Sequence, residues 1–124
     1  MGEIKQNLKI IGLKGIMRVD AIFDSGATMS YIKQSIAEKI GLKDLGKVTY
    51  EMPNGKEEEG YMSSMIVVIR NRSAPTQIII SPTLKDDLIL GQNFLQYNDI
   101  ILNFKKDKFR FGEHQPKVRR IYKI

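Results

Sequence analysis

The sequence predicts an all-β protein, a small closed or sandwiched β-domain of about seven short strands with one short helix. Short apolar or alternating segments recur between turn signals, which is the pattern of strands. Only one stretch changes to the period of a real helix. The length of 124 residues suits one domain, and a hydrophobic fraction of 42% is enough for a core without disulfides.

The first two predicted strands cover residues 3–12 and 16–23, with a turn at 13–15. In the second strand apolar residues alternate, so Asp24 falls on the Ile22 side at the end of the strand. Burial of a carboxylate at the end of a strand costs free energy unless hydrogen bonds or opposite charges compensate it. Asp24 therefore either caps a turn or has chemistry to perform.

The hydrophobic period then changes to that of a helix. Ile32, Ile36 and Ile40 recur at every fourth position and form one helical stripe. Ser30 is predicted to be the N-cap, and Gly41 stands where a left-handed residue commonly ends a helix. We therefore expect one short helix within SYIKQSIAEKIGL.

The rest of the chain is predicted to consist of hairpins and short apolar strands. Two strands flank MPNGKEEEG, residues 52–60, in which the Asn-Gly pair is a strong hairpin signal. TQIIIS and DLILG are predicted as buried strands, residues 92–97 as one or two helical turns, and DIILNF with KFRFG as a closing hairpin. No repeat or linker precedes residue 113, so we assign residues 1–112 to one domain and 113–124 to a basic C-terminal tail.

Composition excludes several classes of function. The chain has no cysteine and only one histidine, His114, so we expect no thiol chemistry, no zinc or other metal and no cofactor. No segment approaches the ~18 consecutive apolar residues of a spanning helix, and no signal-peptide pattern opens the chain. We therefore expect a cytoplasmic protein without a membrane partner. The net charge of +6 permits contact with nucleic acid but does not by itself indicate such a partner.

Asp24, at the start of Asp24-Ser25-Gly26-Ala27-Thr28, is the candidate catalytic residue. An Asp-Ser-Gly triplet alone is a weak signal, because these residues are common in turns. Here the triplet follows an apolar strand and precedes a helix. Further along, Ile89-Leu90-Gly91 repeats the order of apolar strand, glycine and short helix.

Together these features resemble the retropepsin-like aspartic proteases. In that family a catalytic loop, a flap hairpin and an apolar-apolar-Gly strand behind the loop follow one another in this order. The resemblance covers roughly residues 5–112 and implies a small closed β-barrel of the retropepsin-like acid protease type. The helix after the motif is similar to that of cellular and bacterial members, such as the protease domain of DNA-damage-inducible proteins.

The resemblance implies an aspartic endopeptidase that acts on a protein or peptide substrate. Two facing carboxylates would share one proton, so that one activates the lytic water and the other polarises the scissile carbonyl. No second Asp-Ser/Thr-Gly occurs, so two chains must each supply Asp24 at a two-fold axis, as a homodimer. Gly26 would let backbone N–H groups approach the carboxylates. Ser25 Oγ would hydrogen-bond across the two loops.

The resemblance also places the flap. Its residues would be Met52, Pro53, Asn54, Gly55, Lys56, Glu57, Glu58, Glu59 and Gly60. Retroviral flaps have a glycine-rich tip, whereas this one carries three glutamates. These glutamates either form a solvated hairpin tip or favour basic residues in the substrate.

The basic tail has two possible structures. Residues 117–124 could form one short strand of ~25 Å, or a basic arm without regular structure, which we favour. We expect the dimer contacts instead at residues 1–10, at the Asp24 loop and at 98–112.

Two other functions stay open. A retropepsin fold without activity could serve as a dimerisation or peptide-binding module. A basic OB-like barrel could bind single-stranded nucleic acid, for which NFKKDKFRF supplies aromatic residues between cations. The OB-like barrel gives no reason for Asp-Ser-Gly before a helix.

Overall fold

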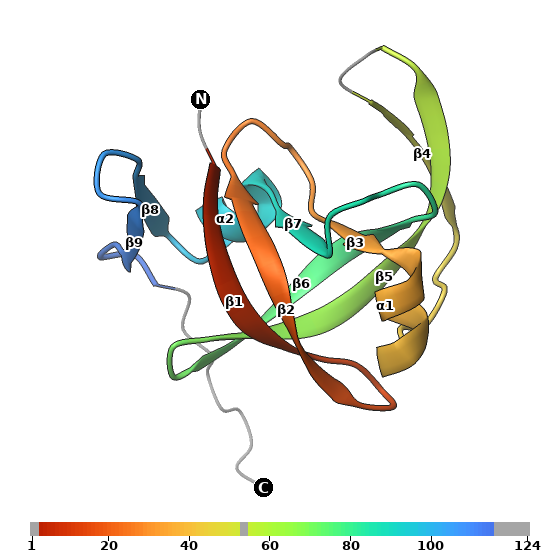
Figure 1. Ribbon diagram of the computed structural model, residues 1–124, viewed down its shortest axis with the longest axis horizontal. Coiled ribbons are helices and arrows are strands. Elements are labelled where there is room, and N and C mark those ends of the chain that lie inside the picture. The colour runs from red at the N-terminus through yellow and green to blue at the C-terminus, as the bar shows by residue number, and fades with distance from the viewer. Residues whose placement is uncertain (1–2, 53–54, 116–124) are drawn as a thin grey trace, which may run out of the picture.

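The barrel begins with an antiparallel pair, β1 (Glu3–Ile11) and β2 (Ile16–Asp24), in which Glu3 lies opposite Asp24. The computed structural model describes residues 3–52 and 55–115 of the chain (Figure 1). Buried side chains alternate along β1 and the first half of β2, as the sequence predicts, because each strand turns one face to the core; near the end of β2, Ala21, Ile22 and Phe23 are all buried. Residues 117–124, whose structure was left open between arm and strand, lie outside the described residues.

The remaining elements follow in chain order. They are β3 (Tyr31–Lys33), α1 (Gln34–Ile40), β4 (Lys47–Glu51), β5 (Glu57–Ile69), β6 (Arg72–Ser81), β7 (Leu88–Leu90), α2 (Gln92–Tyr97), β8 (Ile100–Asn103) and β9 (Lys108–Phe111). Neither helix in the described part of the chain is long and apolar enough to cross a membrane.

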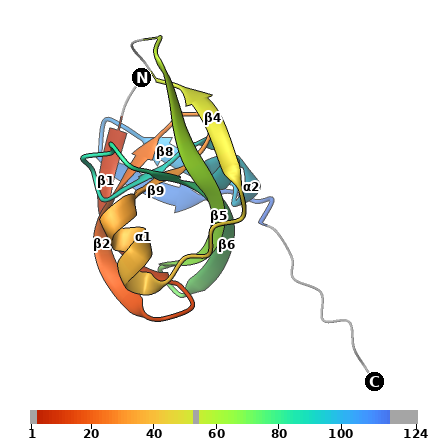
Figure 2. The same ribbon diagram turned by 90° about the vertical axis from the view of Figure 1, so that its right-hand side faces the viewer.

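Six of the strands close into a barrel, as predicted. One sheet has the order β1-β2-β7-β3-β6-β5-β4, and a further pairing of β1 with β5 closes its first six strands. β7 runs parallel to β2, and β3 runs parallel to β6. Among the described strands β4 pairs only with β5, and this hairpin extends beyond the barrel (Figure 2).

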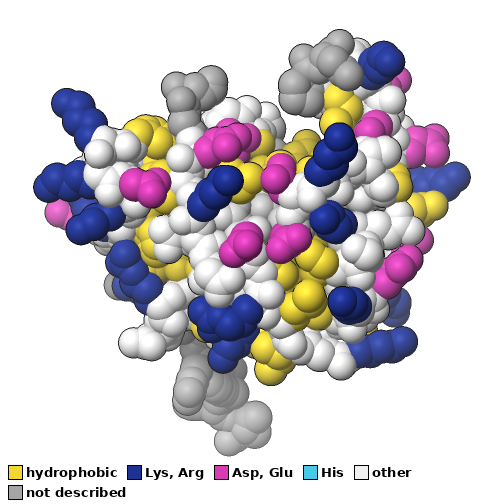
Figure 3. Space-filling model, viewed as in Figure 1, with side chains coloured by type: hydrophobic (Ala, Val, Ile, Leu, Met, Phe, Trp, Pro, Cys, Tyr) yellow, Lys and Arg dark blue, Asp and Glu magenta, His cyan; other side chains and the backbone are white. Residues whose placement is uncertain are grey.

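Aliphatic and aromatic side chains fill the barrel. The largest fully buried ones include Phe23, Ile32, Leu88 and Leu90. β8 and β9 form a separate two-stranded sheet, and Phe109 of β9 packs its ring edge-on against Phe23 at 5.1 Å between centroids. Lys and Arg side chains gather over this small sheet, at the left edge of Figure 3.

The start of α1 differs from the prediction. Ser30 is not the N-cap, because residues 31–33 form β3 and the helix begins only at Gln34, after an extended Lys33. Tertiary pairing decides this, since β3 fills the space between β6 and β7 and completes the barrel. The end of α1 is as predicted, with Gly41 left-handed at φ 72°.

Truncation of a side chain inside the barrel should be far more costly than truncation on its surface. Leu90 is fully buried, whereas Leu13 is 81% exposed. We expect Leu90→Ala to lower the free energy of unfolding by about 2–5 kcal/mol, and Leu13→Ala by no more than about 0.5 kcal/mol. Urea denaturation of both variants measures the difference. Equal losses would contradict the position of Leu90 in the core.

Candidate active site

Asp24 is the last residue of β2, where the chain leaves the barrel. Its side chain is half-buried, and its Oδ1 accepts a hydrogen bond of 2.8 Å from the backbone N–H of Gly26. The N–H of Ala27 donates to the backbone carbonyl of Asp24 at 3.2 Å. The chain therefore turns sharply at Ser25-Gly26, and the carboxylate is held by the backbone that follows it.

The first turn of α2 supports the loop after Asp24, residues 24–30, here called the Asp24 loop. The N–H groups of Gln92 and Asn93 donate to the carbonyls of Ala27 and Thr28, at 2.7 and 3.0 Å. The side-chain amide of Gln92 donates to the carbonyl of Ser25 at 2.8 Å. The first N–H groups of a helix have no partner within the helix, so the loop carbonyls satisfy them here.

Ser30 forms a buried link between the same two segments. Its hydroxyl accepts a hydrogen bond from the N–H of Gly91 at 3.0 Å and donates to Asn93 Oδ1 at 2.7 Å. Ser30 is fully buried, so its hydrogen bonds replace contacts with water. Sequence reasoning missed this role, and it also missed Gln92 and Asn93. The only signal was two amide side chains directly after the predicted glycine.

Gly91 lies where the two segments meet most closely. A Cβ at this position would lie 2.2 Å from the carbonyl oxygen of Met29 and 2.6 Å from that of Ala27. β7 pairs with β2 in parallel, so Leu90 lies beside Phe23 and Gly91 follows beside the loop. The strand predicted to lie behind the site is thus in contact with the Asp24 loop.

A pocket of about 420 Å³ opens beside Asp24. The Asp24 loop, β4 and the segment from β6 to β7 form its walls, so segments far apart in the sequence meet here. The lining residues are Asp24, Gly26, Ala27, Thr28, Tyr31, Tyr50, Glu51, Met52, Ser81, Leu84 and Ile89. This is the Asp24 pocket.

Two tyrosines form an aromatic wall of the Asp24 pocket. The rings of Tyr31 and Tyr50 lie 5.3 Å apart, so the wall joins the end of the Asp24 loop to the flap hairpin. Burial raises the pKa of Tyr31 above its ordinary value. Burial also raises the pKa of Tyr50, and contact with Glu58 adds to the rise while a hydrogen bond with Ser81 opposes it, giving about 12. Tyr50 is therefore a neutral hydrogen-bond donor at neutral pH.

The glutamates of the predicted flap point in different directions. Tyr50 donates to Glu58 Oε1 at 2.8 Å, and the hydroxyl of Thr83 donates to Glu58 Oε2. Glu57 and Glu59 are exposed on the other face of the strand, and Glu59 lies 4.0 Å from Lys47 Nζ.

The structure brings part of the predicted flap to the pocket. Met52 lines it, whereas the other described flap residues, Gly55 to Gly60, are not among its lining residues. Pro53 and Asn54 lie outside the described residues. Ser25 contributes its backbone carbonyl to the loop support. The role predicted for its hydroxyl requires a second chain and stays a prediction.

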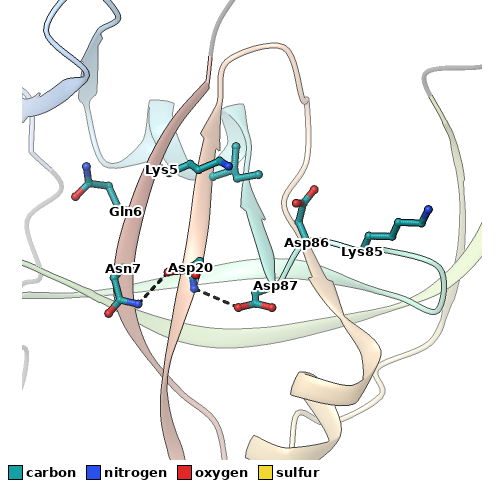
Figure 4. Close-up of a pocket in the computed structure, with 8 residues that line it drawn as sticks. Lys5, Gln6, Asn7, Asp20, Lys85, Asp86 and Asp87 are labelled. Atoms are coloured by element: carbon teal, nitrogen blue, oxygen red, sulfur yellow. Dashed lines mark hydrogen bonds between the residues drawn. The ribbon is translucent and has the colours of Figure 1, made fainter.

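A second pocket, of about 450 Å³, lies between β1, β2 and the β6–β7 loop (Figure 4). Asn7 donates to Asp20 Oδ1 at 3.1 Å, and the N–H of Asp20 donates to Asp87 at 3.3 Å. The side chains of Lys85 and Asp86 point away from Asp20 (Figure 4). These contacts tie β1 to β2, and β2 to the β6–β7 loop. Within residues 3–52 and 55–115, no group of three or more His, Asp or Glu side chains could hold a metal ion.

The comparison with family models shows the family of this chain. The model described as gag-polyprotein putative aspartyl protease matches residues 12–97, more than half of the chain. The chain belongs to this aspartyl protease family. The predicted resemblance to retropepsin-like proteases is confirmed, and the OB-like barrel is excluded. A comparison with curated proteins found no match.

Solved structures share the fold of this aspartyl protease family member. The retroviral protease-like domain of Ddi1 from Leishmania major is 16% identical, with a TM-score of 0.63 over 93% of this chain and 92% of its own. EIAV protease in complex with the inhibitor HBY-793 is 15% identical, with a TM-score of 0.60 over 77% and 86%. Simian Foamy Virus (mac) protease is 20% identical, with a TM-score of 0.51 over 74% and 93%. At these identities the likeness shows the fold alone.

The close approach at Gly91 predicts a severe effect of one methyl group. We expect Gly91→Ala to lower the free energy of unfolding by about 3 kcal/mol, because its Cβ would meet two backbone carbonyls that cannot move independently. Gly15→Ala is the matched control, since a Cβ there meets nothing within 4 Å. Urea denaturation compares the two variants. A Gly91→Ala variant as stable as Gly15→Ala would contradict the predicted clash.

The raised pKa of Tyr50 predicts a specific loss of stability at high pH. The folded state holds the phenol proton to about pH 12, whereas an unfolded tyrosine releases it near 10. The stabilisation is therefore complete below about pH 10 and is lost as the pH rises to about 12. Tyr50→Phe should cost about 1 kcal/mol at pH 9, and less at pH 11.5 because only the wild type loses stability from this group. Denaturation at both pH values measures the difference in stability between the wild type and Tyr50→Phe. The same difference at both pH values would contradict the prediction.

Proposed function

We propose that this protein is an aspartic endopeptidase that acts as a homodimer, with Asp24 of each subunit activating water for peptide-bond hydrolysis. The observation that carries this proposal is the position of Asp24: a carboxylate held by the N–H of Gly26, at the wall of a pocket bordered by a hairpin. Membership of the aspartyl protease family supports it.

The chemistry requires two carboxylates. The other acidic residue at the pocket, Glu51, is an exposed residue of β4, and no second Asp lines the pocket in the described part of the chain. A two-fold axis beside the Asp24 loop would supply the missing group from a second chain. The site is therefore incomplete in one subunit.

In the dimer the two Asp24 carboxyl groups share one proton, because two adjacent carboxylates that were both ionised would repel each other strongly. The ionised carboxylate takes a proton from water, whose oxygen attacks the carbonyl carbon, while the other carboxyl gives its proton to the carbonyl oxygen. The resulting diol collapses as the C–N bond breaks: the carboxyl that took the proton from water gives it to the leaving amine, and a hydroxyl of the diol returns a proton to the other carboxylate. One water is consumed, and an acid and an amine are formed.

The dimer contacts proposed for residues 98–112 are supported by exposed apolar side chains. Ile101 is 38% exposed and Phe104 is 47% exposed, and the β8–β9 sheet has no other strand beside it in the described residues. An open two-stranded sheet with apolar side chains is suited to pair with its copy. We propose the Asp24 loop and the N-terminal strand as the other contacts.

The walls of the pocket indicate the substrate class. Apolar and aromatic groups form most of the lining, with Tyr31, Tyr50, Met52, Leu84 and Ile89 around the carboxylate. We propose that apolar side chains of a peptide substrate occupy it. Glu57 and Glu59 face away, so they do not support a preference for basic residues.

Replacement of Asp24 tests the proposed catalysis. Asp24→Asn should abolish cleavage of a random peptide library, which we expect the wild type to cleave, because an amide cannot take a proton from water at neutral pH. The fold should persist, since the amide oxygen can still accept the hydrogen bond from Gly26. Cleavage products are read by mass spectrometry. Full activity of Asp24→Asn would contradict the mechanism, and an inactive wild type would favour a silent peptide-binding module.

A mixing experiment tests whether the site is shared. An excess of the inactive Asp24→Asn chain should suppress wild-type cleavage, because mixed dimers hold only one carboxylate. Sedimentation of the same mixtures measures the dimer. Unchanged activity in mixtures that sediment as dimers would show that one chain is sufficient.

A further inference from the structure

The flap hairpin needs support outside the barrel. Within the part of the chain that the structure describes, β4 pairs only with β5, and a two-stranded hairpin is marginally stable by itself. The segment that faces it is the β6–β7 loop, residues 82–87, which contributes Leu84 to the Asp24 pocket. A contact between the hairpin and this loop therefore joins two segments that each supply lining residues to the Asp24 pocket.

Glu58 makes that contact. It lies opposite Tyr50 in the β4–β5 register, and its carboxylate accepts from the hydroxyl of Tyr50 on one oxygen and from that of Thr83 on the other. Tyr50 belongs to the hairpin and Thr83 to the β6–β7 loop. One carboxyl group thus joins the hairpin to the loop, with one hydrogen bond on each of its oxygens.

We propose that Glu58 is a positioning residue. It fastens the β4–β5 hairpin to the β6–β7 loop and thereby fixes the distance of the hairpin from the Asp24 pocket. The expected effect of Glu58 on substrate binding rests on the proposed protease function, whereas the fastening of the hairpin does not. It assigns Glu58 an internal partner on each oxygen, so the carboxylate does not serve as a binding site for a basic substrate side chain.

Neighbouring residues supply matched controls. Glu59 is the next residue on the same strand, faces away from Glu58 and lies near Lys47. Glu58→Gln keeps the shape and can keep both hydrogen bonds, because its amide oxygen accepts from Tyr50 and its NH₂ donates to Thr83. Glu58→Ala removes both. Thr83→Val removes only the loop contact at an exposed position, and Thr83→Ser restores the hydroxyl.

Amide hydrogen exchange tests the fastening without any need for catalysis. In the chain of 124 residues, exchange over residues 47–51 and 57–61 should become about tenfold faster in Glu58→Ala and should also become faster in Thr83→Val. Glu58→Gln, Thr83→Ser and Glu59→Gln should remain near the wild type. Unchanged exchange in both Glu58→Ala and Thr83→Val would overturn the proposal, even if the protein proves to be no protease.

Peptide kinetics then separate positioning from direct recognition. Two fluorogenic peptides are used that differ only in lysine or norleucine beside the scissile bond. Glu58→Ala should raise KM about tenfold for both peptides with little change in kcat, and Glu58→Gln should largely rescue both. A selective loss of the lysine peptide in both Glu58 variants would overturn the proposal and show that the carboxylate reads the substrate. If the wild type cleaves neither peptide, the proposed function is contradicted. Hydrogen exchange alone then tests whether Glu58 fastens the hairpin to the loop.

Discussion

The site depends on one close approach of two backbones, between the Asp24 loop and the start of α2. The carbonyls of Ala27 and Thr28 need donors, and the first N–H groups of α2 need acceptors. Each set satisfies the other only because residue 91 has no Cβ, which would meet two carbonyl oxygens within 2.6 Å. The absence of one methyl group thus allows the loop that holds Asp24 to be rigid.

The barrel brings these two segments together. Parallel pairing places the ends of β2 and β7 at the same edge, so that Asp24 and Gly91 both follow directly from a buried pair, Phe23 and Leu90. The polar groups at this edge are satisfied: no buried side-chain nitrogen or oxygen in the described part of the chain lacks a hydrogen-bond partner. The Asp24 carboxyl can therefore lie at the end of a core strand, because the next residues are outside the core and the N–H of Gly26 donates a hydrogen bond to it.

The Asp24 loop and the β4–β5 hairpin are held in place by different kinds of contact. The Asp24 loop is held by backbone groups and by the buried Ser30, so its geometry is built into the fold. The β4–β5 hairpin extends beyond the barrel and is held by side chains, through Tyr50 and Glu58. Backbone contacts fix the Asp24 carboxylate, while side-chain contacts that can break and re-form are suited to a hairpin that, in the proposed function, would have to admit a peptide.

The sequence by itself determined the local features of this protein: the alternation that makes β1 and β2, the period that makes α1, its left-handed end at Gly41, and the Asp24 motif. Each follows from neighbours within a few residues. Only the tertiary structure decided that residues 31–33 form a strand and that Ser30 binds Gly91, because the partners lie 48 or more positions away, in β6, in β7 and at Gly91 before α2. It also decided which glutamate faces inward, because hairpin register, not composition, selects the face of each side chain.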